Sequence, residues 1–192
     1  MLLQGLSAKS SSYALLPSAF GTFGVVWQRA EAAVKVHRIQ LPNERTSVEE
    51  LIQEVFAGAG QGLCPPVVEL CERIQTFLEG EAVDFDLGII ALERCSDFQQ
   101  RVLLAEREIP RGWVSTYGKI ARHLGIPGGA RAVGGALARN PFPIVIPCHR
   151  AIRSDGELGG YQGGREMKRA LLELEGIEVS PAGRVLTDRV YY

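Results

Sequence analysis

Alternating and β-branched apolar runs in the first part of the chain predict strands. The runs at 21–27 and 33–41 are bounded by glycine and by Pro42, so we expect a hairpin with its turn at 28–32. A further apolar run at 85–92 predicts another strand. A small sheet is therefore expected in this part of the chain.

Two stretches between these runs have the spacing of helices. Residues 47–56 begin with Ser47 and carry Glu50 three positions later, which is the capping-box pattern of a helix start. Residues 67–78 repeat apolar side chains at helical spacing and stop before Gly80. Strands and helices together predict a small mixed α/β unit.

From residue 96 onward the pattern is helical. We expect helices at 96–108, 116–124 and 130–139. The last two are short and are joined by a glycine-containing turn, which is the outline of a helix-turn-helix. The chain is therefore predicted to form two domains, an α/β domain over 1–94 and a helix-rich domain over 95–192.

The composition is that of a globular protein with a core, with 46 % hydrophobic and 22 % charged residues. No apolar run approaches the roughly 18 residues that span a bilayer, and the start of the chain lacks the features of a signal peptide. We therefore expect a cytoplasmic protein that does not bind membranes. The four cysteines contain no Cys-x-x-Cys pair and the three histidines lack zinc-finger spacing, so reduced thiols, no metal site and no cofactor are expected.

The net charge of −1 hides an uneven distribution. Residues 101–192 carry 14 basic and 9 acidic side chains, a net +5, whereas the remainder carries 7 and 13, a net −6. A run of one sign is typical of a surface that meets phosphates, and a solvated basic face is the alternative. Seven basic residues and no carboxylate lie between 109 and 154: Arg111, Lys119, Arg122, Arg131, Arg139, Arg150 and Arg153.

The helix expected at 130–139 has small side chains over much of its surface. Gly134 and Gly135 lie inside it, and each interior glycine costs about 1 kcal/mol relative to alanine, so something must approach this backbone closely. Either a neighbouring helix packs against it, or its smooth face enters a narrow groove of DNA with Arg131 and Leu137 as sizeable probes. Few long polar side chains are present to read base edges, so the second reading predicts sequence-independent binding.

The segment Ile146-Pro-Cys-His-Arg150 places a cysteine directly beside a histidine. In a continued strand Cys148 and His149 would point to opposite faces, but a helical turn that starts at Pro147 can bring them to one region. A cysteine at a helix N-terminus beside an imidazole is readily ionised. We therefore expect Cys148 to be an ionised nucleophile, and the alternative is an ordinary core cysteine.

A glycine-rich loop follows at 156–164 and surrounds Tyr161 and Gln162. Such a loop lets the backbone approach a ligand closely, and its aromatic side chain can stack on a planar group. A flexible surface loop is the alternative. Another helix is expected at 165–175, ended by Gly176.

Taken together, these motifs resemble a known family. The cysteine segment is preceded by Arg131-Ala-Val-Gly-Gly135 and followed by Gly160-Tyr-Gln-Gly-Gly164 and Leu174-Glu-Gly176. Their order and spacing are similar to those of the O6-alkylguanine-DNA alkyltransferases, also named methylated-DNA–protein-cysteine methyltransferases. The resemblance covers about residues 67–177. It implies a ribonuclease-H-like α/β first domain and a winged-helix-like second domain with the helix-turn-helix, which binds DNA and accepts the alkyl group.

The resemblance implies roles for the residues of the reactive centre. Cys148 matches the alkyl acceptor, and His149 matches the base that acts through a water. Glu175 matches the carboxylate that orients this histidine, and Lys168 matches a residue near the reactive sulfur. No metal and no cofactor are implied, because the zinc ligands of some animal members have no counterpart here.

A second group matches residues that contact DNA. The helix containing Ala130, Gly134 and Gly135 matches the one that enters the minor groove. Arg131 matches the side chain that fills the space of an extruded nucleotide. Tyr117 matches the residue that crowds the neighbouring phosphate, helps to rotate the damaged nucleotide outward and can donate to guanine N3.

A third group matches the guanine pocket. Asn140 corresponds to a residue that ties the two halves of the site together. The pocket positions correspond to Leu137, Ala151, Tyr161 and Gln162, and Gln162 stands where animal members carry serine.

The function implied by the resemblance is DNA repair in a single turnover. A monomer would bind duplex DNA through the minor groove, rotate out an O6-alkylguanine, and accept its alkyl group irreversibly on Cys148. O4-alkylthymine is a second candidate substrate, and the expected location is the cytoplasm, with the nucleoid or nucleus where the DNA lies. Two alternatives differ in class. A lesion-binding protein would resemble this domain but lack the acceptor cysteine, and a Cys-His-Glu hydrolase would turn over a small ester or peptide.

Overall fold

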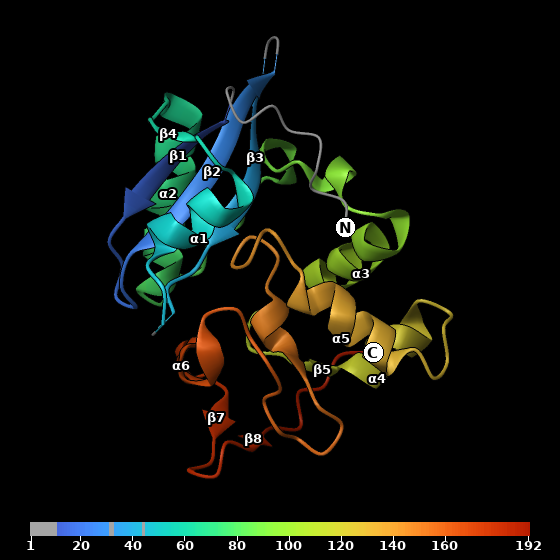
Figure 1. The fold of residues 1–192 in the computed structure, drawn as a ribbon. Coiled ribbons are helices and arrows are strands. Elements are labelled where there is room, and N and C mark those ends of the chain that lie inside the picture. Colours follow the sequence, from blue (N-terminus) through green and yellow to red (C-terminus); the bar gives the residue numbers. More distant parts are fainter. Residues whose placement is uncertain (1–10, 31–32, 44) are drawn as a thin grey trace. The chain divides into compact units, whose positions relative to one another are not determined.

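The computed structural model describes residues 11–30, 33–43 and 45–192 (Figure 1). The chain divides into two compact units, Met1–Ala91 and Leu92–Tyr192. The division expected from the sequence, after residue 94, lies three residues further along the chain. Each unit is described separately below.

A four-stranded sheet organises the first unit, in the order β3-β2-β1-β4. The middle strands pair antiparallel, and β4 runs parallel to β1. The predicted hairpin is confirmed, but residues 28–30 of its expected turn continue β2, and 31–32 lie outside the described residues. The pattern did not predict the first strand. The strands are β1 (Ser11–Leu16), β2 (Phe23–Ala30), β3 (Ala33–Gln40) and β4 (Gly60–Gln61).

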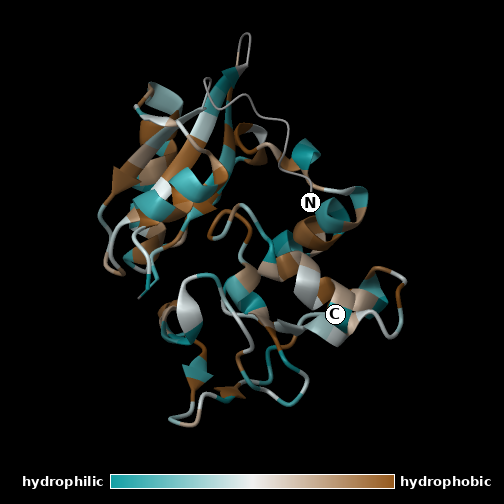
Figure 2. Cartoon of the chain, viewed as in Figure 1, coloured by the Kyte–Doolittle hydropathy of each residue, from teal (hydrophilic) through white to brown (hydrophobic). Residues whose placement is uncertain are grey.

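Helices α1 (Val48–Val55) and α2 (Pro65–Leu78) lie on opposite sides of this sheet (Figure 1). Successive strand residues point to opposite faces, and both Val25 and Val26 of β2 are fully buried, so both faces are covered. Gly24 permits the close approach of α1, because a Cβ there would lie 2.6 Å from Ile52. Figure 2 shows hydrophobic residues along these strands and on parts of α2.

The predicted helix starts are confirmed by their caps. The Ser47 side chain accepts from the Glu50 backbone N–H, and the Glu50 side chain accepts in return from the Ser47 N–H. Helix α2 begins two residues earlier than expected because prolines occupy its first turn, where no backbone donor is needed. The predicted core position of Cys71 is also confirmed, since its side chain is fully buried.

The strand expected at 85–92 is wrong. Asp86 caps a short 3₁₀ helix, η2 (Leu87–Ile89), by accepting from the Gly88 N–H, and a second one, η3 (Leu92–Arg94), follows. Ile90 forms a single bridge with β3 and is buried. The apolar run at 85–92 therefore indicates burial in the core, but the hydrogen bond of the Asp86 side chain determines the backbone conformation.

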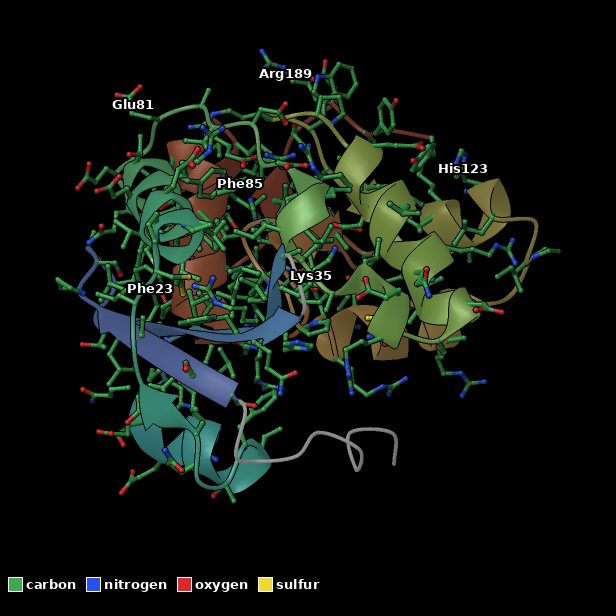
Figure 3. The ribbon with its side chains drawn as sticks, turned by 90° about the horizontal axis from the view of Figure 1, so that it is seen from above. Phe23, Lys35, Glu81, Phe85, His123 and Arg189 are labelled. Atoms are coloured by element: carbon green, nitrogen blue, oxygen red, sulfur yellow. The ribbon has the colours of Figure 1, made fainter. Side chains whose placement is uncertain are left out.

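The second unit confirms the predicted helical pattern. Ser96 and Thr116 cap the first two helices through their hydroxyl groups. The helices are α3 (Asp97–Glu108), α4 (Tyr117–His123), α5 (Ala130–Ala138) and α6 (Gly164–Leu174). His123, labelled in Figure 3, ends α4 and stacks on Tyr192 with ring centroids 3.8 Å apart.

Short strand pairs position the segments that follow these helices. Strand β5 (Ser115–Thr116) pairs parallel with β6 (Ala151–Ile152), and β7 (Glu178–Val179) pairs antiparallel with β8 (Val185–Leu186). Because β5 leads into α4 and β6 follows the cysteine segment, this pairing sets Tyr117 beside the Pro-Cys-His-Arg turn. An apolar cluster that includes Val114, Ile152 and Leu172 packs beneath it.

Candidate active site

The cysteine lies in a turn that begins at proline, as predicted. Residues Cys148–Arg150 form the 3₁₀ helix η4, with Pro147 as its N-cap. The Arg150 N–H donates to the Pro147 carbonyl at 2.9 Å, and the Cys148 N–H donates to the Ile146 carbonyl at 2.8 Å. Ile144, just upstream, has φ 73°, a conformation that a β-branched residue rarely adopts. The tight entry into this turn therefore carries backbone strain next to the cysteine.

Asn140 fixes the position of the sulfur. Its Nδ2 donates to the Cys148 Sγ at 3.2 Å and to the Ile146 carbonyl at 3.1 Å, so both amide hydrogens are used. Its Oδ1 accepts from the Phe142 N–H at 2.9 Å. The amide is held at three points and directs one N–H bond at the sulfur, which favours the thiolate over the thiol.

The expectation that Cys148 is ionised at rest is wrong. The side chain is 8 % exposed, and burial raises the pKa of the thiol to about 11, because a thiolate loses its hydration there. The Asn140 hydrogen bond and the charge of Lys168 lower this pKa, but they do not offset the effect of burial. The site at neutral pH therefore holds a thiol, and its proton must leave before or during attack.

His149, Glu175 and Arg150 form a buried charge network. The Glu175 Oε1 lies 3.0 Å from His149 Nε2 and accepts from Arg150 Nη2 at 2.7 Å. Its Oε2 accepts from Arg150 Nε at 2.9 Å. Arg150 also donates through Nη1 to the Ile109 carbonyl at 2.6 Å. A fork-to-fork pair of this kind is a strong charge-assisted contact.

Glu175 occupies this place because it ends a helix. It is the C-cap of α6, and Gly176 follows with φ 80°, the usual conformation after a helix end. Burial alone would raise the pKa of Glu175, but the hydrogen bonds and charges of His149 and Arg150 outweigh it and bring the pKa to about 2. The carboxylate is therefore ionised throughout the neutral range.

His149 is neutral in this site. It is fully buried, and burial lowers its pKa below 6.5 in spite of the opposing effect of Glu175. An ionised carboxylate only accepts, so Nε2 carries the proton towards Glu175 and Nδ1 carries the lone pair. The chain thus places a neutral base next in sequence to the thiol, with a carboxylate to stabilise its charged form.

Lys168 is also fully buried, on the same face of α6 as Leu171 and Leu172. Its Nζ donates to the Ala151 carbonyl at 2.6 Å and to the Gly160 carbonyl at 3.5 Å. Burial lowers the pKa of this amine to about 8. The cation therefore joins the segment after the cysteine turn to the glycine-rich loop.

Cys148 forms part of the wall of a cavity of about 200 Å³. This volume is below the roughly 300–1,000 Å³ of sites for drug-sized ligands, and it suits one small planar group. The hydroxyl of Tyr161 is buried and, among the described residues, has no hydrogen-bond partner. The lining residues are Tyr117, Gly134, Leu137, Ala138, Asn140, Pro143, Cys148, Gly160, Tyr161 and Gln162.

The cavity brings together most of the predicted pocket residues. Leu137, Asn140, Tyr161 and Gln162 line it, together with Tyr117 and Gly134 from the group expected to contact DNA. Ala151 and Lys168 are not among its lining residues, and Lys168 donates to the Ala151 carbonyl. Ala130, Arg131 and Gly135 also lie away from it, on α5.

One glycine of the loop is required by the protein itself. Gly159 has φ 73°, and a Cβ there would lie 2.7 Å from the Tyr117 hydroxyl. The loop thus closes directly on Tyr117. The sequence predicted that the backbone of this loop approaches a ligand closely. At Gly159 the backbone instead approaches the side chain of Tyr117, whereas Gly160 lines the cavity.

The glycines of α5 are different. A Cβ on Gly134 would lie 3.8 Å from Tyr117, and one on Gly135 would lie 3.6 Å from the flexible end of Arg139, both ordinary contact distances. Packing by the described residues therefore does not require glycine at either position. Arg131 and Ala132 on the same helix are exposed.

The acid-free basic run separates into two groups. Arg150 is buried against Glu175, Arg153 pairs with Asp155 at 2.7 Å, and Lys119 donates to the Tyr192 carbonyl. Arg111 also donates to the Leu174 carbonyl at 2.8 Å. These four members have partners within the protein, although Arg153 is itself exposed. Arg122, Arg131 and Arg139 are exposed. The run is therefore only partly a surface available to phosphates.

Sequence reasoning missed two charged residues of the centre. Arg150 was counted with the phosphate-facing run, although its place directly after the Cys-His pair signalled a role beside them. Glu106 lies within the helix expected at 96–108 and was given no role there, but it comes three and four positions after Leu103 and Val102, on the buried face of α3. That spacing was the available signal.

Within the part of the chain that the structure describes, no helix has the length and apolar character of a membrane span. In the same residues, no three His, Cys, Asp or Glu side chains gather in an arrangement suited to a metal ion. The four cysteines are free thiols.

Comparison with known proteins gives consistent matches to one group. Residues 97–177 match the family described as 6-O-methylguanine DNA methyltransferase, DNA binding domain. The methylated-DNA–protein-cysteine methyltransferase of Methanothermobacter thermautotrophicus is 50 % identical over 117 residues, which are 60 % of this chain and 65 % of that protein. The protein of the same name from Mycobacterium bovis is 46 % identical over 61 % of this chain and 69 % of its own length.

A solved structure matches over a longer part of the chain. The crystal structure of Mycobacterium tuberculosis OGT in complex with DNA superposes with a TM-score of 0.69 at 33 % identity, covering 85 % of this chain and 92 % of that one. The α/β fold with helices and small sheets is therefore shared, beyond the matched sequence segment.

The buried carboxylate of Glu175 gives a test of the network. In Glu175→Gln, Arg150 would remain buried without a counter-charge, so we expect unfolding free energy at neutral pH to fall by about 3–5 kcal/mol. Because the folded pKa of Glu175 is lowered from 4.5 to about 2, its contribution is present above pH 4.5 and is lost as pH falls towards 2. The difference between the proteins should therefore shrink over that range, as measured by urea unfolding.

A matched control lies on the same helix. Glu173 is exposed and pairs with Arg169 one turn away, so Glu173→Gln should cost less than about 1 kcal/mol. Equal losses for the two variants, or a Glu175→Gln deficit that does not change with pH, would contradict the assigned network.

Proposed function

The chain belongs to the methylated-DNA–protein-cysteine methyltransferase family, and on this premise we propose that it repairs duplex DNA by moving the alkyl group of O6-alkylguanine onto Cys148. One observation carries the proposal. The Cys148 sulfur lies in the wall of a base-sized cavity and is held by the Asn140 amide. The next residue, His149, is neutral, and its Nε2 faces the buried carboxylate of Glu175.

The chemistry is a single displacement. The sulfur attacks the alkyl carbon of the lesion, a C–S bond forms, and the bond from that carbon to O6 breaks. The electron pair of the broken bond passes to the guanine, which takes up a proton and becomes an ordinary base. The thiol proton moves to His149 through a water, and Glu175 stabilises the imidazolium that results.

The product explains why each molecule should act once. A thioether has no good leaving group, and the charge network at Glu175 offers no nucleophile to remove the alkyl group. Cys148 therefore remains alkylated after the first reaction. O4-alkylthymine remains a candidate substrate for the same step.

Access to the cavity requires the damaged base to leave the helix. We assign α5 to the minor groove, with Ala130, Gly134 and Gly135 on the face that meets the DNA, because nothing within the described protein requires those glycines. The exposed side chain of Arg131 would fill the gap left by the base. Rotating a base out costs a few kcal/mol, least for a lesion that pairs poorly, which favours damaged bases.

Tyr117 connects the groove to the pocket. It follows directly on β5, lines the cavity and is held by Gly159 of the loop. We assign it to the phosphate beside the extruded base and to guanine N3. Leu137, Tyr161 and Gln162 would contact the base within the cavity, with Ala151 and Lys168 supporting the wall behind it.

We further infer a ribonuclease-H-like first unit and a winged-helix-like second unit. The antiparallel β1-β2-β3 sheet with a parallel fourth strand supports the first assignment, and the α4–α5 pair with β5 and β6 supports the second. A monomer in the compartment that holds the DNA is sufficient for this chemistry, because the reactive residues all come from one unit.

The first test is a mass measurement. After incubation with duplex DNA containing O6-methylguanine, intact protein mass should rise by one methyl group, and peptide mapping should place it on Cys148. Cys148→Ala should gain no mass yet retain DNA binding, while Cys95→Ser should react normally. Repeated turnover by one molecule, or a methyl group on another cysteine, would refute the proposal.

The helix face gives a second test. Gly135→Ala should raise the free energy of unfolding by about 1 kcal/mol, because alanine is the better helix former and the added Cβ has room. The same change should weaken binding to duplex DNA, measured by fluorescence anisotropy. Thr76→Ala in α2 serves as a control that improves a helix without touching DNA. Unchanged affinity in Gly135→Ala would show that this face does not meet the groove.

Arg131 gives a third test, which separates base extrusion from chemistry. Arg131→Ala should slow alkyl transfer from duplex DNA much more than transfer from free O6-benzylguanine, since the free base needs no extrusion. Arg73→Ala removes an exposed charge that lies on α2, outside the basic run, and should affect both substrates little. Equal losses of both activities in Arg131→Ala would remove its role in extrusion.

A further inference from the structure

Glu106 is a buried acid that the proposed reaction does not use. Its side chain has no exposed surface, and it lies on the inward face of α3 with Val102 and Leu103. The carboxyl faces the backbone N–H of Ala151, the residue whose carbonyl accepts from Lys168 at 2.6 Å. Within the described residues, neither carboxyl oxygen makes a hydrogen bond of normal length and angle. A buried polar group without a full set of partners calls for a role.

Five Glu, His, Arg or Lys side chains are buried in the described chain, and we call them the buried charge cluster. They are Glu106, His149, Arg150, Lys168 and Glu175. Arg150 and Glu175 neutralise each other through their two-point contact, and His149 is neutral. One cation, Lys168, therefore remains for two acids, Glu106 and Cys148.

Two anions cannot both be compensated by one buried ammonium. We propose that Glu106 is a positioning residue that competes with Cys148 for the charge of Lys168, so that the thiolate forms readily only while Glu106 is protonated. The inference rests on the proposed function in one respect, that Cys148 reacts as a thiolate. It adds a residue on α3 to the groups that govern this reactivity.

The directions of the pKa shifts agree with this competition. Burial raises the pKa of Glu106 to about 8, while Lys168, Arg150 and the Ala151 N–H oppose the rise. The charge of Glu106 raises the pKa of the Cys148 thiol, and both acids raise that of Lys168. The titratable and charged groups that face Glu106 are Lys168 from α6, Arg150 and Cys148 from η4, Tyr117 from α4, and Tyr192 from the end of the chain.

The competition has a defined pH dependence. Near neutral pH Glu106 is mostly protonated, so the charge of Lys168 is available to the sulfur. Above about pH 8 Glu106 ionises, and Lys168, whose pKa is also about 8, loses charge in the same range, so both changes oppose the loss of the thiol proton. Reactivity of Cys148 should therefore rise less steeply with pH than that of an isolated thiol.

The test removes the competing charge while keeping the shape of the side chain. In Glu106→Gln, the pH midpoint for alkylation of Cys148 by iodoacetamide, followed by mass spectrometry of its own peptide, should fall by about one pH unit. Glu106→Leu, which also fits an apolar helix face, should give the same direction.

A second measurement is needed in case iodoacetamide reaches the buried Cys148 too slowly. The ¹³C shift of Cys148 Cβ, recorded across the same pH range, follows thiol ionisation without any chemical reaction. Asp97→Asn, an exposed acid at the start of α3, is the control and should leave the midpoint unchanged. An unchanged midpoint in both folded Glu106 variants would overturn the inference.

These measurements use no DNA, so they are independent of the repair proposal. If alkyl transfer from DNA failed while the midpoint moved as expected, the competition would stand and the proposed function would fall. If transfer occurred and the midpoint did not move, the reverse would hold.

Discussion

The site depends on keeping buried charge in balance. The Glu175 carboxylate at the end of α6 contacts the guanidinium of Arg150 and the ring of His149. Without these partners, the buried carboxylate and guanidinium would each be an uncompensated charge. Breaking such a set leaves an uncompensated charge, which costs several kcal/mol. The same carboxylate fixes the tautomer of His149, so the contact that stabilises the second unit also prepares its base.

Burial also explains why the sulfur rests as a thiol. The enclosure that creates a base-sized cavity removes water from Cys148 and raises its pKa, which protects it from random alkylation and oxidation. The groups that favour the thiolate, Asn140 and Lys168, are already in place and need no rearrangement. In the proposed reaction, what the resting site lacks is removal of one proton, and His149 would supply that step when a substrate is bound.

The sequence predicted features that short-range chemistry decides. The Ser47–Glu50 box, the turn at Pro147 and the helix end at Glu175 follow from a few neighbouring residues, and the structure has all three. It did not predict features that depend on the environment. An apolar run at 85–92 is equally compatible with strand or buried turn, and the ionisation of Cys148 depends on burial that no spacing reveals. Glu106 was missed because a glutamate on a helix is normally solvated.

The glycines differ in whether packing within the protein requires them. At Gly24 and Gly159 an added Cβ would collide with Ile52 and with Tyr117, so internal packing accounts for them. At Gly135 an added Cβ would meet only the flexible end of Arg139, at an ordinary contact distance of 3.6 Å, yet the glycine costs a nine-residue helix about 1 kcal/mol of stability relative to alanine. A cost that nothing inside the described protein explains points outward, to a surface that must come closer to the α5 backbone than a methyl group allows. The proposed groove contact would meet that requirement, and Gly134 of the same helix lines the cavity that holds Cys148.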